Sequence, residues 1–329
     1  MGKLSISVAT WDYDRVRAII DGRVPIEGCD VNHLATAPEE TFFRVLASRE
    51  FDVAELSLSS YMIALSRGGC GYRAVPVFPS RAFRHSAIYI RTDRGIAAPQ
   101  DLRGKVVGVP EYQLTANLWV RGILEDQYGV RPNQISWRRG GMEEPGRREK
   151  VAIAPPGVEI ETIPDNDTLS RMLEDGRIDA LIAPRAPSCF VRRSPHVGRM
   201  FPDFRSQERA YFLETRIFPI MHVLAIREEL LDAHPWLATS VFKAFAQAKQ
   251  VCMQELHEVT ALKITLPWVV AEAEATCEVM GDDFWPYGLQ ENRVTLGAAV
   301  RYAWEQGLTA RRLSIEELFV PSTLETSKI

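Results

Sequence analysis

Short apolar runs alternate with stretches of helical spacing along most of the chain. Apolar clustering or alternation predicts strands at 4–8, 31–34, 51–56, 75–78, 87–90, 106–109, 135–137, 179–183 and 218–226. Apolar residues recurring every three or four positions predict helices between them, at 13–20, 36–49, 57–65, 115–124 and 167–176. This regular exchange predicts an α/β protein built on parallel sheets.

Several of the predicted helices start directly after a strand. Thr36 is expected to cap the first of them, with a proline in the first turn and Glu39 three residues on. Ser57 and Ser59 open a second helix, and Thr115 opens a third. The free N–H groups of such helix starts favour an anion. The alternative is that Ser57 or Ser59 only caps its helix.

The last third of the chain is predicted to be almost entirely helical. Apolar faces of helical spacing follow residue 235, at 237–256, 268–280 and 293–306. Such a tail either wraps the first part of the chain or forms a contact with a second copy, so a homo-oligomer is one of two expectations.

The composition is that of an ordinary globular protein, with 46% hydrophobic and 25% charged residues. A net charge of −4 gives no reason to expect nucleic acid or an anionic membrane as partner. No apolar run approaches the roughly 20 residues of a membrane-spanning helix. The N-terminal stretch lacks the features of a signal peptide, and the five cysteines are scattered without metal-ligand spacing. We therefore expect a cytoplasmic protein with reduced thiols.

The stretch 78–91 brings three basic side chains together between two predicted strands. Arg81, Arg84 and His85 lie within five residues. Guanidinium forks match the carboxylates of a small anion, and His85 can exchange a proton near neutral pH. The alternative is that both arginines are solvated loop residues and His85 is a core histidine.

Other candidate side chains lie at or near the ends of predicted strands. Glu55 closes one strand, and Arg185 follows another, at the edge where open α/β sheets bind ligands. Glu111 lies in the turn before a helix, and His222 lies within the last strand. Glu55 either accepts a proton from a substrate hydroxyl or merely pairs with an arginine. The mixed-charge patch at 147–150 is expected to be solvated surface.

The order of elements resembles the two-lobed fold of type 2 periplasmic binding proteins. The stretch DLRGKVVGVP at 101–110 is much like the lead into their second lobe. The resemblance implies a discontinuous lobe 1 with the C-terminal helices, a lobe 2 between its two parts, and a ligand cleft between the lobes. The expected bounds are 1–94 and 217–329 for lobe 1 and 95–216 for lobe 2.

In that fold the chain crosses between the lobes twice, side by side. The crossings are expected near 91–97 and 215–219. On this arrangement His85 and His222 approach each other, and the helix starts of the two lobes face each other across the cleft.

Four longer stretches carry a closer resemblance. They are AELSLSSYMI (54–63), PVFPSRAFRHSAIYI (76–90), GVPEYQLTANLWVRGIL (108–124) and GGMEEPGR (140–147). Together they resemble the 4,5-dihydroxyphthalate decarboxylase family, over nearly the whole chain. The resemblance implies a cytoplasmic enzyme of aromatic catabolism that converts 4,5-dihydroxyphthalate to protocatechuate and CO2. It does not fix the substrate, since a relative could decarboxylate another hydroxylated aromatic acid.

Such a reaction needs cations for two carboxylates, a base at the catechol edge and an acid over the ring carbon. We assign the acid to His85, so its replacement by alanine is expected to lower kcat by about 10²–10⁴-fold. The base is Glu55, Glu111 or His222. The carboxylates are assigned to Arg81, Arg84 and Arg185, with help from Ser57, Ser59 and Thr115.

No nicotinamide, flavin or pyridoxal motif is evident, and this route requires no such cofactor. The alternative is a divalent metal on His85, His222, Glu55 and Glu111, which no short metal-binding motif supports. The rival functions are a non-catalytic solute-binding protein for a small carboxylate anion and a cytosolic ligand sensor. The missing export signal argues against the first, and the missing nucleic-acid-binding helix pair argues against direct regulation by the second.

Overall fold

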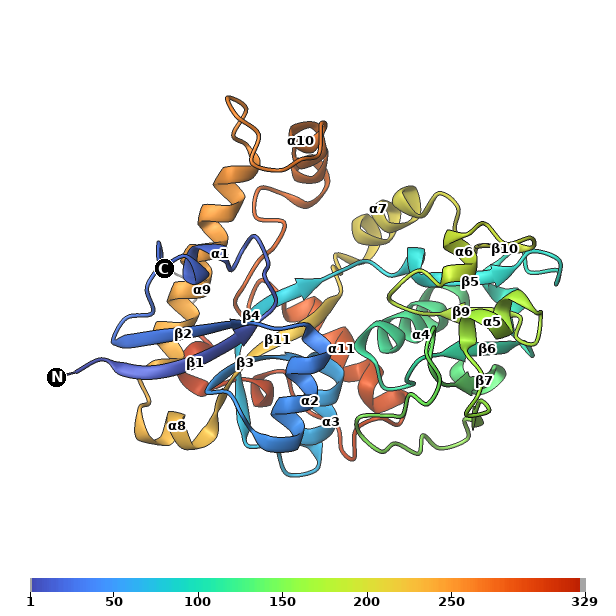
Figure 1. Cartoon of the computed structure of the whole chain (residues 1–329), viewed down its shortest axis with the longest axis horizontal. Helices are drawn as coiled ribbons and strands as arrows, with labels where there is room; N and C mark the ends of the chain where they lie inside the picture. Colours follow the sequence, from blue (N-terminus) through green and yellow to red (C-terminus); the bar gives the residue numbers. More distant parts are fainter. Residues whose placement is uncertain (1, 326–329) are drawn as a thin grey trace.

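The computed structural model describes residues 2–325 and contains two β-sheets side by side (Figure 1). The first sheet has the strand order β2-β1-β3-β11-β4. Strands β1, β2 and β3 run parallel, as predicted, whereas β11 runs antiparallel to β3 and β4 because it returns from the second sheet. The strands are β1 (Leu4–Thr10), β2 (Cys29–Ala35), β3 (Val53–Ser57), β4 (Tyr72–Arg81) and β11 (Ile220–Arg227).

The second sheet has the strand order β10-β5-β9-β6-β7-β8. Its centre is parallel, from β9 through β6 and β7 to β8, whereas β5 runs antiparallel to both its neighbours. Both sheets are therefore mixed. The strands are β5 (Ile88–Arg91), β6 (Val106–Val109), β7 (Ser136–Arg139), β8 (Ile160–Thr162), β9 (Ala180–Ile182) and β10 (Val197–Arg199).

Two chain segments join the sheets and lie side by side. The amide of Ala82 donates to the carbonyl of Pro219 (3.1 Å), and the rings of Phe83 and Phe218 lie 4.7 Å apart. The second crossing lies where the sequence predicts it. The first lies earlier than predicted, between β4 and β5, because the strand 88–91 already pairs in the second sheet. We call the parts built on the first and second sheets lobe 1 and lobe 2.

Helices cover both sheets and form the end of the chain (Figure 1). Helix α9 packs along β4 and α1, and α11 packs against α3 of lobe 1 and α4 of lobe 2. The helices are α1 (Arg17–Ile20), α2 (Pro38–Ser48), α3 (Leu58–Ser66), α4 (Thr115–Tyr128), α5 (Leu169–Glu174), α6 (Ser188–Val191), α7 (Phe204–Thr215), α8 (Glu228–Ala233), α9 (Leu237–Leu256), α10 (Val269–Met280) and α11 (Arg293–Glu305).

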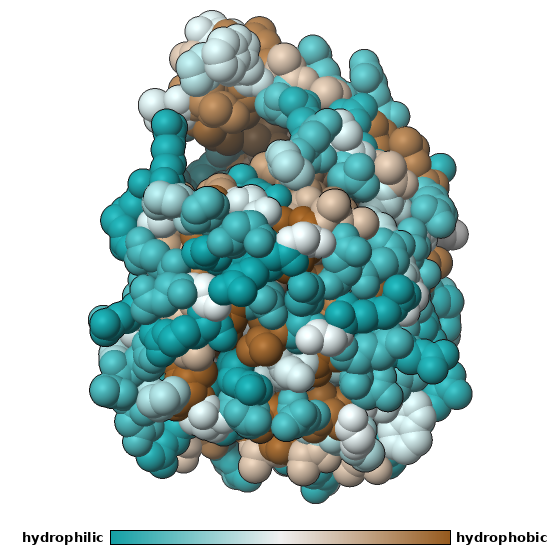
Figure 2. Space-filling view, turned by 90° about the vertical axis from the view of Figure 1, so that its right-hand side faces the viewer, coloured by the Kyte–Doolittle hydropathy of each residue, from teal (hydrophilic) through white to brown (hydrophobic). Residues whose placement is uncertain are grey.

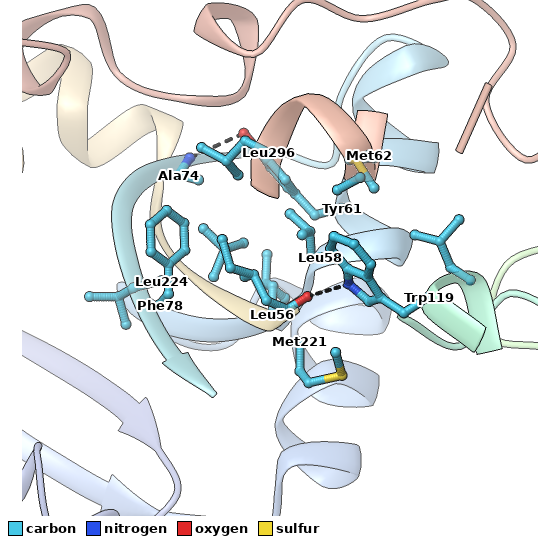
Figure 3. Packing of buried hydrophobic residues seen from close by; sticks show 14 of the residues in the cluster. Leu56, Leu58, Tyr61, Met62, Ala74, Phe78, Trp119, Met221, Leu224 and Leu296 are labelled. Carbon is cyan, nitrogen blue, oxygen red and sulfur yellow. Dashed lines mark hydrogen bonds between the residues drawn. The ribbon is translucent and has the colours of Figure 1, made fainter. Parts of the chain in front are cut away.

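The main hydrophobic core runs through both lobes without a break. Trp119 of α4 reaches the start of β11, where its indole Nε1 donates to the carbonyl of Ile220 (2.8 Å; Figure 3). The hydroxyl of Tyr61 accepts from the amide of Ala74 (3.1 Å) and so ties α3 to β4. Because α4 is packed in this way, the lobes are joined on one side.

The predicted cap of α2 is wrong. The helix begins at Pro38 with Ala37 in the capping position, and no side chain caps it. Thr36 instead shares a hydrogen bond with Thr41, hydroxyl to hydroxyl (2.5 Å). Within residues 2–325, no helix combines the length and apolar character that a membrane crossing demands.

Candidate active site between the two lobes

A cleft of about 640 Å³ lies between lobe 1 and lobe 2. Lobe 1 contributes Glu39 and Phe43 of α2. Lobe 2 contributes the loops after β6, β7 and β9, including Glu111, the turn 141–148 and Arg185. These are carboxyl ends of parallel strands, where α/β sheets bind ligands.

Glu111 is the buried centre of charge in this cleft, with 1% of its surface exposed. Its Oε1 accepts from Nζ of Lys150 (2.6 Å) and from Nε of Arg147 (2.8 Å), and Oε2 accepts from the side-chain Nε2 of Gln113 (2.9 Å). Burial works to raise the pKa of Glu111, but the charges and hydrogen bonds of Lys150 and Arg147 hold it below its ordinary value. Glu111 is thus a fixed anion that orients two cations.

Arg147 also spans the cleft, since one of its terminal nitrogens lies 3.3 Å from Oε1 of Glu39 in lobe 1. The prediction that 147–150 is solvated surface is therefore wrong for Arg147 and Lys150. Arg148 and Arg185 are exposed in the same cleft, and neither makes an ion pair with any residue of the described range 2–325. A charge run directly after a turn at a strand end was the signal that could have marked this patch.

The two predicted helix starts meet directly across the lobes. The hydroxyl of Thr115 accepts from the amide of Ser59 (3.0 Å) and shares a hydrogen bond with the hydroxyl of Ser57 (2.9 Å). The hydroxyl of Ser59 donates to the carbonyl of Gln113 (2.6 Å). All of these groups are buried, so the amide of Ser59 binds the other lobe here rather than an anion. Ser57 lies at the capping position of α3 but does not cap it.

Glu55 and His222 form a buried carboxylate–imidazole pair in lobe 1. They come from neighbouring strands β3 and β11, and Nδ1 of His222 lies 2.5 Å from Oε1 of Glu55. Glu55 is fully buried and also accepts from the Tyr13 hydroxyl (2.7 Å) and the Trp11 amide (3.1 Å). Burial works to raise the pKa of Glu55, but the charge and hydrogen bond of His222, with the other donors, hold it below its ordinary value.

This pairing fixes the tautomer of the neutral imidazole. An ionised carboxylate can only accept, so Nδ1 carries a proton, and in the neutral ring Nε2 is then the nitrogen with the lone pair. The side chain of His222 is 18% exposed, and its ring packs edge-on against Phe42 of α2 at 4.9 Å. His222 also lies opposite Ser57 in the sheet, next to the contact with Thr115. The imidazole thus lies beside the contact between the two lobes, and among the described residues its Nε2 has no hydrogen-bond partner.

The structure does not place His85 in this site. It is 2% exposed, and its ring lies edge-on to Phe201 (5.4 Å) and Tyr211 (5.2 Å). Its Nδ1 is buried without a hydrogen-bond partner in the part of the chain that the structure describes, and burial lowers the pKa of His85 to about 4. Within residues 2–325 no hydrogen bond or ring contact joins His85 to His222. The core-histidine alternative describes its surroundings.

Arg81 is also occupied elsewhere. Its guanidinium donates to the carbonyls of Phe218 (3.2 Å) and Pro286 (2.7 Å) and to the side chain of Asn292. Burial without a carboxylate partner lowers the pKa of Arg81 to about 9. The residue fastens the returning chain and the segment before α11 to the end of β4, which differs from the predicted contact with substrate.

Arg84 lies at the first crossing and is half-buried. Its Nε donates to the sulfur of Met221 (3.1 Å), and burial lowers its pKa to about 10. Of the three arginines assigned to substrate, the structure places Arg185 in the cleft.

Within the described residues, no group of three or more His, Cys, Asp or Glu side chains is arranged to hold a metal ion. The four residues of the metal alternative are divided among three places. Glu55 and His222 pair in lobe 1, Glu111 pairs with cations in lobe 2, and His85 lies among aromatic rings.

Comparisons with known proteins bear on what this site does. No family model matches the chain. The chain is 46% identical, over all of both proteins, to the 4,5-dihydroxyphthalate decarboxylase of Comamonas testosteroni. It is 50% identical over 204 residues to the 4,5-dihydroxyphthalate decarboxylase of Pseudomonas putida, covering 62% of this chain and 79% of that one.

Solved structures show the fold. The periplasmic aliphatic sulphonate binding protein SsuA of Escherichia coli superposes with a TM-score of 0.53 at 12% identity over 97% of each chain. The desulfurization enzyme DSZB superposes with a TM-score of 0.52 at 13% identity over 99% of each chain. The fold is therefore the two-lobed one of periplasmic binding proteins, as the sequence predicts. The Comamonas protein is 46% identical over the full length of both chains, which shows the family as well as the fold. The chain belongs to the 4,5-dihydroxyphthalate decarboxylase family.

Proposed function

We propose that the chain converts 4,5-dihydroxyphthalate to protocatechuate and CO2 in the cleft between its lobes. The observation that carries the proposal is the Glu55–His222 pair, which lies beside the contact between the lobes made by Ser57 and Thr115. Full-length identity to a protein of that activity supports the same substrate.

The reaction needs a base and an acid. Direct loss of CO2 would leave an unstabilised aryl anion. Deprotonating the hydroxyl para to the carboxylate pushes electrons onto the ring carbon that bears the carboxylate, and an acid then protonates that carbon. CO2 departs, its bonding electrons return to the ring, and the phenolate regains the first proton. One proton is consumed overall, and the route needs no redox step.

His222 is the proposed base for the para hydroxyl. Its Nε2 is free to accept the proton, and Glu55 stabilises the imidazolium that forms. Tyr13 stays a donor to Glu55, because burial and the neighbouring carboxylate raise the pKa of its hydroxyl. Glu55 is a positioning residue on this account, and Glu111 is a counter-ion rather than a base.

The substrate carboxylates are proposed to bind the cations of lobe 2. The cleft lining carries four acidic residues (Glu39, Glu111, Glu143, Glu144) and four basic ones (Arg147, Arg148, Lys150, Arg185), so its net charge does not select an anion. Selection rests instead on Arg148 and Arg185, which make no ion pair within the described residues. Their guanidinium groups offer forks that match a carboxylate.

The test is to incubate the purified chain with 4,5-dihydroxyphthalate and measure protocatechuate and CO2. We expect one of each per substrate consumed, and we expect the activity to survive exhaustive chelation of divalent metals. Recovery of bound but unchanged 4,5-dihydroxyphthalate would instead support a solute-binding protein. Loss of activity on chelation, with recovery on adding one metal, would contradict the metal-free route alone.

A further inference from the structure

A second cavity, of about 280 Å³, lies between α7 and α10, away from the interlobe cleft. Figure 2 shows a hollow with hydrophobic walls at the top of the molecule, the end at which α10 stands in Figure 1. The cavity shares no lining residue with the cleft. Its walls are largely aromatic and apolar, from Phe83, Phe212, Phe218, Val279, Phe284 and Trp285.

The aromatic walls already pack as ring pairs. Phe83 lies edge-on to Phe212 at 6.4 Å and tilted against Phe218 at 4.7 Å, and Phe218 lies edge-on to Trp285 at 5.3 Å. Aromatic pairs gain free energy at such separations beyond the area they bury. A wall of this kind suits one more aromatic ring. The volume limits the size of the ligand, because pockets for drug-sized ligands start at about 300 Å³.

Charged side chains define the rim. Arg205 of α7 pairs with Glu272 of α10 (2.7 Å), and Glu208 accepts from the amide of Ser86 (3.3 Å). Arg209 is half-buried, and its Nη1 donates a long hydrogen bond to the carbonyl of Ala275 (3.4 Å). Among the described residues Arg209 has no carboxylate partner, so the rim holds one guanidinium with donors to spare.

We infer that this cavity is a second ligand site, for a single-ring aromatic monocarboxylate. The ring lies against Phe83, Phe212 and Phe218, and the carboxylate binds Arg209. A second carboxylate on the ring is disfavoured because the remaining rim charges are paired or negative. The site touches both crossings through Phe83 and Phe218, so its ligand is in contact with the hinge between the lobes.

The test is a calorimetric titration of the full chain with benzoate. Ala275, a half-buried lining residue of α10, is replaced by tryptophan to fill the cavity; Ala271, exposed on the same helix and outside the lining, is the matched control. We expect Ala271→Trp to bind benzoate like the unaltered chain and Ala275→Trp to lose it. Arg209→Gln should weaken binding roughly tenfold to a hundredfold, the effect of losing a charge-assisted hydrogen bond.

A cleft variant separates the two sites. Arg185→Gln should leave benzoate binding unchanged, and phthalate should bind this cavity more weakly than benzoate. Unchanged binding in both Ala275→Trp and Arg209→Gln, or loss in Arg185→Gln but not in Arg209→Gln, would overturn the inference. If Ala275→Trp does not fold, the comparison of Arg209→Gln with Arg185→Gln decides by itself. None of these outcomes depends on the proposed decarboxylation.

Discussion

Two imidazoles in this chain are held in opposite ways. His222 has a carboxylate at Nδ1 and a free Nε2, which is the arrangement of a general base. Among residues 2–325, His85 has no hydrogen-bond partner at Nδ1, and its ring lies against Phe201 and Tyr211, which suits only the neutral form. The sequence contains both histidines but does not say which one meets a carboxylate, because that partner lies 167 residues away.

The burial of His85 predicts a pH dependence of stability. Its pKa is about 4 in the folded chain and about 6.5 when unfolded, so only the unfolded state binds the proton between these values. The free energy of unfolding should therefore fall as the pH drops from about 6.5 to about 4, by an amount on the order of 3 kcal/mol.

The variant His85→Phe isolates this effect, since it keeps an aromatic ring and removes the titrating group. Urea unfolding at a series of pH values should show a flatter profile for the variant, with kcat near that of the unaltered chain. Parallel profiles for the two proteins would contradict the lowered pKa of His85. A kcat loss of a hundredfold would instead support the catalytic role predicted from the sequence.

The network behind His222 predicts a graded loss of activity. Glu55→Gln removes the charge that stabilises the imidazolium, and the same carboxylate-to-amide change beside a general-base histidine lowers kcat by up to about 10⁴-fold. Tyr13→Phe removes one donor to Glu55 and leaves the pair intact, so its effect should be smaller. Steady-state kinetics should show that kcat falls in this order while KM stays nearly constant; an equal rise in KM in both variants would indicate a merely structural network.

At the scale of elements, apolar periodicity is sufficient to predict most strands and helices. It fails where the contacts of a residue are determined by a partner far away in the sequence. Thr36 matches a capping pattern but bonds Thr41, and the patch at 147–150 resembles surface until Glu111 of another loop is placed beside it. The first crossing lies earlier than the sequence predicts for the same reason, because β5 pairs with β9 and β10 in the second sheet.

The packing of α4 on α11 predicts opposite effects for two glycines. A Cβ on Gly122 of α4 would lie 2.4 Å from ring carbons of Tyr302, which is buried and held by its hydrogen bond to Asp126 (2.6 Å). Gly122→Ala should therefore destabilise the fold by about 1–3 kcal/mol. A Cβ on Gly297 of α11 would meet nothing within 4 Å, so Gly297→Ala should stabilise it by up to about 1 kcal/mol. Denaturant titrations of both variants check the sign; equal shifts would contradict this packing.

At the scale of the whole molecule, the fold could be predicted from the order of elements, whereas the cleft contacts could not. Which side chains meet across the lobes depends on how the second lobe is turned. The structure shows that the lobes share a core through α4 and touch through Ser57, Ser59 and Thr115. We therefore expect closure of the lobes and substrate binding to be linked at the start of α4.

Thr115→Val tests that link. Valine keeps the shape but leaves the buried amide of Ser59 without its acceptor, a loss of about 1–3 kcal/mol. The closed arrangement should become less populated, so KM should rise about tenfold and the radius of gyration from small-angle X-ray scattering should increase. Thr115→Ser, which keeps the hydroxyl, should resemble the unaltered chain. Identical KM values for the valine and serine variants would show that this contact does not control closure.

The assignment of the base to His222 is tested most directly by measuring single-turnover decarboxylation by His222→Gln. The glutamine keeps a polar side chain but cannot take up the proton, so the rate of CO2 release from bound 4,5-dihydroxyphthalate should fall by about 10²–10⁴-fold. The dissociation constant should stay close to that of the unaltered chain, because the carboxylates are proposed to bind the cations of lobe 2. A rate within a few-fold of the unaltered chain would contradict the assignment of the base to His222.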